Sequence, residues 1–208
     1  MLPGPFPLSE SPRGTPALGR IGVIEGHGEA AGRGHSPSQA ARKGMALANR
    51  FGIASVIEAR ADDRILAAYR ELDRRNELTL RVLASLEVDP DRDVAQIPSL
   101  AEKRRAARGR RLKATAAKIF VDGVMESRTA ALLEPYMGEP EDRGRPLLEQ
   151  AELDRLAVAL EKAGFQIHVH AIGDRAVRMT LDAFAAARAA NGDLGLRHHI
   201  AHLELIDP

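Results

Sequence analysis

The chain has 208 residues and no cysteine, which excludes disulfide frameworks, thiolate-bound metal clusters and cysteine nucleophiles. Its 44% hydrophobic and 28% charged residues are typical of globular proteins, and 30 basic against 29 acidic residues leave a net charge of +1. This balance argues against bulk attraction to nucleic acid or membrane. With no apolar run near the roughly 20 residues that cross a bilayer, and no signal peptide at the N-terminus, we expect a soluble cytoplasmic protein.

The N-terminal segment differs in composition from the rest of the chain. Residues 1–35 are rich in glycine and proline and are expected to form a loop segment, with a short isolated strand at 21–24. A helix is predicted over 36–50, because Ser36 can cap it and Gln39 lies three residues later, where it completes a capping box.

Strands and helices then alternate along the chain. Strands are predicted at 51–59, 79–88, 116–123, 166–173 and 198–206, and helices at 62–76, 99–112, 149–165 and 174–191. This order is typical of a parallel α/β architecture, either an open doubly wound sheet or a (β/α)8 barrel. The absence of a GxGxxG motif after any strand counts against dinucleotide binding.

The strand QIHVHAIG carries an unusual polar face. Side chains alternate along a strand, so Gln166, His168 and His170 share one face, which would line the interior of a barrel. Interior polar groups are costly unless they are paired or ligate something. His170 lies nearest the carboxyl end of the strand, where barrel active sites form.

Two further strands carry candidate partners. Lys118 lies in the apolar strand AAKIFVDG, and His202 shares a face with His198, Ile200 and Glu204 in the last strand. Neutral imidazole is a common ligand of divalent zinc or iron, and a lysine amine can react with CO2 to form a metal-bridging carbamate. The pattern favours a metal centre over the alternative, in which these histidines are hydrogen-bonded core residues.

A basic run at 103–113 could indicate a nucleic-acid-binding segment. It lacks interleaved aromatic residues, and the total charge of the chain is balanced. We therefore interpret it as a solvated helix face and expect no nucleic-acid partner.

Three segments resemble a known family: KIFVDGVMESRTAALLEPY, GFQIHVHAIGDRAVRMTLDAF and RHHIAHLELIDP. They are similar to the amidohydrolase superfamily, and within it to the amidohydrolase family 3 branch, which includes N-substituted formamide deformylase-like proteins. The similarity spans nearly all of residues 36–208, and the combination of HxHAIGD with KxFxDG is quite specific.

The resemblance implies a metal-dependent hydrolase of the (β/α)8 TIM-barrel type, with residues 36–208 forming an incomplete barrel domain of strands two to six. Lys118 matches a fourth-strand lysine that is often carbamylated. His170 and His202 match the fifth- and sixth-strand ligands of a divalent metal, zinc or iron. The implied reaction is hydrolysis of a carbon–nitrogen bond, amide-type but not peptide, in a small molecule by a metal-activated water.

The substrate pocket is expected at the same end of the barrel. We expect His168 to line it together with Arg128, Thr129 and Tyr136, which lie in the polar loop 124–146.

The sequence also departs from the family pattern. It has no counterpart of the first-strand HxH or of the eighth-strand aspartate that serves as ligand and general base, so no catalytic residue is assigned. Ala201 stands where an acidic residue commonly precedes the ligand histidine. The alternative is a truncated, catalytically inactive amidohydrolase fragment, whose open sheet would be closed by a homodimer or by the remainder of the barrel.

Overall fold

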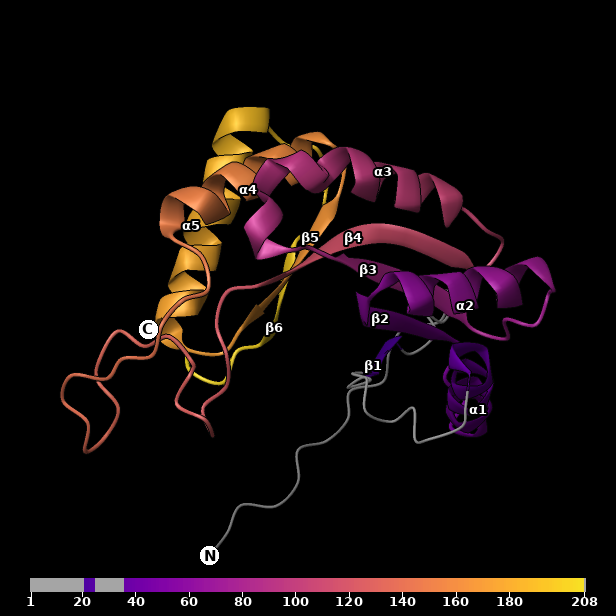
Figure 1. Ribbon diagram of the computed structural model, residues 1–208, viewed down its shortest axis with the longest axis horizontal. Coiled ribbons are helices and arrows are strands. Elements are labelled where there is room, and N and C mark those ends of the chain that lie inside the picture. The colour runs from indigo at the N-terminus through magenta and orange to yellow at the C-terminus, as the bar shows by residue number, and fades with distance from the viewer. Residues whose placement is uncertain (1–20, 25–35, 208) are drawn as a thin grey trace, which may run out of the picture.

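The computed structural model describes residues 21–24, as backbone, and 36–207 (Figure 1). The expected loop segment 1–35 lies outside these residues apart from 21–24. Six parallel strands form one sheet in the order in which they follow along the chain. The strands are β1 (Ile21–Ile24), β2 (Ser55–Ala61), β3 (Arg81–Glu87), β4 (Leu112–Phe120), β5 (Gln166–Ala171) and β6 (His199–His202).

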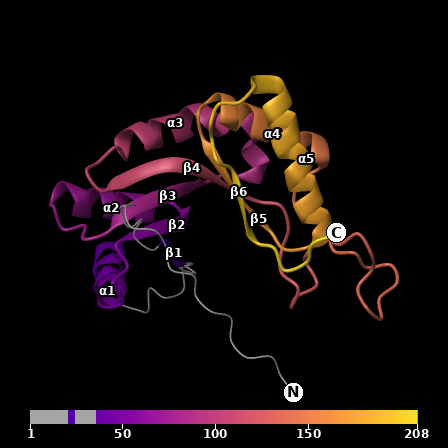
Figure 2. The ribbon, with the colours of Figure 1, turned by 180° about the vertical axis from the view of Figure 1, so that it is seen from behind.

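Helices connect the strands and cover one side of the sheet. They are α1 (Pro37–Arg50), α2 (Asp63–Arg74), the 3-10 helix η1 (Pro90–Gln96), α3 (Ile97–Ala106), α4 (Gln150–Lys162) and α5 (Asp174–Asn191). The sheet curls, with α2 to α5 along its convex side (Figures 1 and 2). This is an α/β fold that forms part of a TIM barrel, as predicted.

The core lies between the sheet and this helical layer. In β5, the alternate residues Ile167, Val169 and Ala171 are fully buried against it. The predicted two faces of this strand are therefore confirmed, and His168 and His170 lie on the concave side. Leucines of α4 and the fully buried Phe165 complete the packing over β5.

Several element boundaries differ from the sequence prediction. The stretch at 21–24 is not isolated, because β1 pairs with β2. β2 begins at Ser55 rather than at residue 51, since Phe51 and Gly52 form the turn after α1 and the backbone of Gly52 is left-handed with φ 70°. The capping box of Ser36 and Gln39 is confirmed.

Part of the basic run 103–113 makes contacts with other elements of the fold. Arg104 donates to the carbonyl oxygens of Ala163 and Gly164 at the end of α4, and Lys103 pairs with Asp63. No helix in the described part of the chain is long and apolar enough to cross a membrane.

Candidate metal centre

A cavity of about 430 Å3 opens on the concave side of the sheet, toward the carboxyl ends of the strands. The three predicted ligands, Lys118 from β4, His170 from β5 and His202 from β6, all line it. The structure therefore brings the three residues to one cavity, on the side of the sheet where barrel active sites form.

Lys118 is almost completely buried, with 2% of its surface exposed. Parallel pairing places it between Glu87 of β3 and His168 of β5, and its Nζ lies 3.4 Å from Nε2 of His168. The Phe120 ring is 5.1 Å from the same Nζ. A lysine amine is therefore held inside the half-barrel among polar and aromatic partners.

His168 is buried, with 2% of its surface exposed, and is not among the residues that line the cavity. Its Nδ1 is 3.0 Å from the buried Ser85 hydroxyl, and its ring centroid lies 4.1 Å from that of His199. Burial, with Lys118 as the next cause, lowers the pKa of His168 to about 3. The neutral imidazole of this β5 residue therefore contacts side chains of β3, β4 and β6.

His170 connects the cavity to the segment that follows β4. Its Nε2 is 2.8 Å from the carbonyl oxygen of Gly123, and its ring centroid is 5.1 Å from that of Phe120. Burial lowers the pKa of His170 as well. The ring is therefore neutral near neutral pH, which is the form that ligates metals.

His202 reaches the cavity by a different route from the one predicted. Register places His199 and Ala201 beside His168 and His170, so His202 pairs with Ala171. β6 ends at His202, whose left-handed backbone (φ 84°) departs from strand geometry. The ring centroid of His202 still lies 4.4 Å from that of His170.

The prediction that His198 and Ile200 share the inward face of His202 is therefore wrong. His202, the last residue of this short strand, leaves the extended conformation, so alternation cannot be counted back from it. His199, rather than His198, lies on the concave side. The His198 ring packs beside Phe184 of α5, and its Nε2 lies 3.1 Å from the buried Glu161 of α4.

The donor chemistry fits part of a divalent-metal site. The imidazoles of His170 and His202 face one cavity with the Lys118 side chain beside them. Among residues 21–24 and 36–207, no three His, Cys, Asp or Glu side chains are close enough to hold a metal ion. Lys118 is the remaining predicted ligand, and it lines the same cavity.

The predicted substrate-binding loop residues lie elsewhere. The exposed Arg128 pairs with Glu139, the Thr129 hydroxyl accepts from the Val124 amide, and the Tyr136 hydroxyl donates to the Ala130 carbonyl. None of the three lines the cavity, to which this loop contributes Val124 and Glu126.

Asp122 is a residue whose role was not foreseen. Its carboxylate, 1% exposed, accepts hydrogen bonds from the backbone amides of Ala131, Ile172 and Gly173 at 2.9 to 3.0 Å. It ties the loop after β4 to the end of β5 and the start of α5. Its position in the KxFxDG motif, directly after a strand, is the signal that could have found it.

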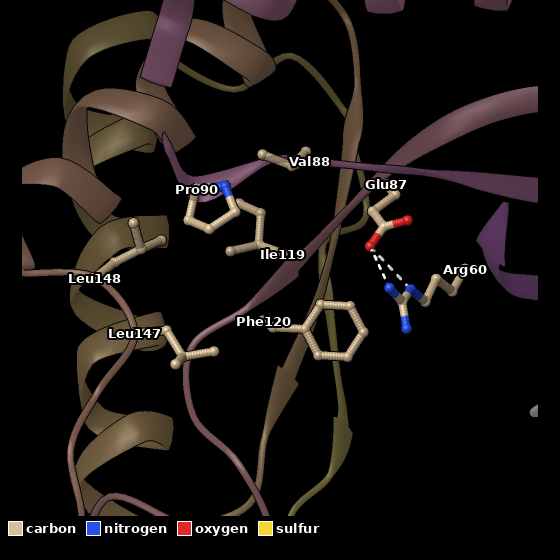
Figure 3. Close-up of a pocket in the computed structure, with 8 residues that line it drawn as sticks. All are labelled: Arg60, Glu87, Val88, Pro90, Ile119, Phe120, Leu147 and Leu148. Atoms are coloured by element: carbon tan, nitrogen blue, oxygen red, sulfur yellow. Dashed lines mark hydrogen bonds and ion pairs between the residues drawn. The ribbon is translucent and has the colours of Figure 1, made fainter. Parts of the chain in front are cut away.

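Other cavity residues were also missed. Glu58 and Arg60 of β2, Glu87 of β3 and Phe120 of β4 contribute to its lining. Arg60 pairs with Glu87, with Nη2 2.6 Å from Oε1 (Figure 3). Glu58 and Arg60, two charged residues within the short strand SVIEARA, were the available sequence signal.

Glu58 gives a pH-dependent prediction. It is mostly buried and accepts a 3.0 Å hydrogen bond from Tyr69, and burial raises its pKa above the ordinary value of 4.5. As pH rises past 4.5, the Glu58 carboxyl loses its proton in the unfolded chain before it does so in the folded protein. The free energy of unfolding therefore falls with rising pH until the raised pKa of Glu58 in the folded protein is passed. Glu58→Gln keeps an oxygen that accepts the hydrogen bond from Tyr69, and it removes this fall in stability because glutamine does not ionise.

Denaturant unfolding across pH checks the prediction. The variant and the wild type should be similar at about pH 4, and the variant should be the more stable at about pH 7. Glu139→Gln, at an exposed loop carboxylate, serves as the control. A constant difference between Glu58→Gln and the wild type at all pH values would contradict the assignment.

The fold and cavity define a partial α/β barrel with candidate metal ligands at its strand ends. The profile of the Amidohydrolase family matches residues 33–208, and the chain belongs to this family. It is 36% identical over 91 residues to Protein LONG AFTER FAR-RED 3 of Arabidopsis thaliana and 40% identical over 91 residues to Exoenzymes regulatory protein AepA of Pectobacterium carotovorum subsp. carotovorum.

These matches cover 44% of this chain but only 16% and 19% of the two relatives. Among solved structures, uncharacterized metal-dependent hydrolases from Pyrococcus horikoshii and Pyrococcus furiosus superpose with TM-scores of 0.67 and 0.65 at 26% and 28% identity. Each match covers 82% of this chain and about a third of the other, 33% and 34%. The chain therefore corresponds to part of a larger fold in these proteins.

Proposed function

We propose that the chain supplies ligands and cavity walls of a metal-dependent hydrolase that acts on carbon–nitrogen bonds of amide type, other than peptide bonds, in small molecules. The observation that carries the proposal is the meeting of Lys118, His170 and His202 at one cavity. Family membership and the two metal-dependent hydrolase neighbours support the same chemistry.

Each residue has a defined part in this proposal. His170 and His202 would hold a divalent cation, zinc or iron, through ring nitrogens, and Lys118 would join them as a carbamate. A bound cation supplies Lewis-acid chemistry, because it polarises a carbonyl group and acidifies water. The Asp122 hydrogen bonds fix the backbone at the end of β5, where His170 lies.

The strand assignment and the branch complete this proposal. β2 to β6 would be the second to sixth strands of the family barrel, with an N-substituted formamide deformylase-like protein as the branch. A cytoplasmic location and closure of the sheet by a second copy or by the remainder of a barrel are part of the same hypothesis. Sedimentation of the purified chain distinguishes a dimer from a monomer.

A second candidate is that the chain binds metal weakly and is inactive by itself. It is favoured by the lack, in the described part of the chain, of three His, Cys, Asp or Glu side chains grouped around one point. The two candidates differ in the metal that is retained and in turnover.

Metal content tests the proposal. The full chain, loaded with zinc in bicarbonate buffer and dialysed, should retain about one equivalent by elemental analysis. His170→Ala and His202→Ala should each lose most of it, because each removes a nitrogen donor. Turnover of simple amides by the loaded wild type separates the enzyme from the inactive alternative.

A matched histidine provides the control. His198→Asn lies off the cavity, and its side-chain oxygen can replace the Nδ1 that accepts from the Ile167 amide. It should retain metal like the wild type. Equal retention by all four proteins, or none by the wild type, would contradict the assigned ligands.

A further inference from the structure

A smaller pocket, whose lining residues are drawn in Figure 3, shares part of its lining with the candidate metal cavity. Its volume is about 220 Å3, and an apolar cavity of about 150 Å3 already holds benzene. A six-membered ring therefore has room in it. Its apolar lining consists of Val88, Pro90, Ile119, Phe120, Leu147 and Leu148.

The walls of this pocket are fixed to the strand that carries Lys118. The Val88 amide donates to the Lys118 carbonyl at 3.0 Å, and the Leu147 amide donates to the Val121 carbonyl at 2.7 Å. Ile119 and Phe120 directly follow Lys118 in the sequence. The pocket walls and Lys118 are thus held in a fixed relative position, as a substrate subsite requires.

The two cavities share a boundary. Arg60, Glu87 and Phe120 line both. The Phe120 ring lies within 5.1 Å of the His170 ring, centroid to centroid, so one aromatic side chain lies between a candidate ligand and the pocket. A molecule with its amide near His170 would place a substituent in the pocket by extending past this shared boundary.

The charge of the pocket selects the kind of substituent. Arg60 and Glu87 are the charged residues in its lining, and they pair with each other through two bonds, at 2.6 and 2.9 Å (Figure 3). Because these charges compensate each other, neither a cation nor an anion gains a strong partner. The remaining surface favours an apolar group.

We propose that this pocket is a specificity subsite, which binds an aromatic or branched aliphatic substituent of an amide substrate. The inference rests on the proposed function, because the reacting bond is taken to lie at the metal cavity. It adds a substrate class, amides with an apolar substituent about the size of a phenyl ring.

Binding of two probes to the full chain tests the subsite. N-benzylacetamide and N-methylacetamide carry the same amide and differ in the apolar group. Methyl NMR should show shifts of the Ile119, Leu147 and Leu148 methyl groups with the benzyl probe, which should bind about tenfold or more tightly than the methyl probe.

Two exposed leucines give a matched pair of variants. Leu147→Trp places an indole across the pocket from a position that is 56% exposed, and Leu181→Trp makes the same change on α5 at 54% exposure. The first should remove most of the preference for the benzyl probe, and the second should leave it unchanged. Circular dichroism checks that both variants are folded.

Two outcomes would overturn the subsite: equal affinity for the two probes, or an undiminished benzyl preference in folded Leu147→Trp. Zinc content measured on the same samples tests the proposed function separately. Retained zinc without benzyl selectivity contradicts the subsite alone. Selectivity at the pocket methyl groups without zinc supports the apolar site and contradicts the hydrolase.

Discussion

Asp122→Ala should lower the free energy of unfolding by about 3–5 kcal/mol, the largest effect we expect from a single polar side chain in this chain. The reason is the number and kind of its partners. Three backbone amides donate to this buried carboxylate, and removing it leaves them without their acceptor. Asp122→Asn should also destabilise the protein, because its amide group turns a donor toward these donors.

Urea unfolding followed by circular dichroism measures this loss. Asp182→Ala is the control, since Asp182 is exposed on α5 and its removal should change stability by less than about 0.5 kcal/mol. Similar effects of Asp122→Ala and Asp182→Ala would refute the anchoring role.

Gly173→Ala should destabilise the protein by about 3 kcal/mol through a steric clash. A Cβ at this position would lie 2.0 Å from the carbonyl oxygen and 2.6 Å from the carbonyl carbon of Ala131. The backbone of Gly173, at φ −76° and ψ 151°, suits alanine, so strain of its own dihedrals does not enter. The loop backbone at Ala131 has to move.

Thermal and denaturant unfolding test this clash against a glycine with free space. Gly44 lies inside α1 and nothing is within 4 Å of its hypothetical Cβ. Gly44→Ala should stabilise the protein by up to about 1 kcal/mol, because alanine favours a helix. The prediction for Gly173 fails if both variants shift the midpoint in the same direction.

Much of the fold could be predicted from local patterns. The alternation of strands and helices, the capping box at Ser36 and the polar face of β5 depend on residues within one element, and all three are confirmed. The candidate cavity could be anticipated in part for the same reason. Lys118 and His170 lie in regular strands, where period-two alternation fixes the face of each side chain.

The remainder depends on partners that are distant in the sequence. His202 leaves strand geometry at its own backbone, so alternation gives the wrong face for β6. Asp122 binds backbone amides, which every residue carries, and its partners lie 9 to 51 residues away. Neither the position of His202 nor the hydrogen bonds of Asp122 produce a periodic pattern in the sequence.

The sheet order has a consequence for how the chain acquires its structure. Each strand pairs with the one that precedes it in the sequence, from β1 through to β6. No strand has to wait for a later segment of the chain before it can add to the growing edge. On the ribosome, successive βα units can therefore assemble in the order of their synthesis, each using the unit before it as a template.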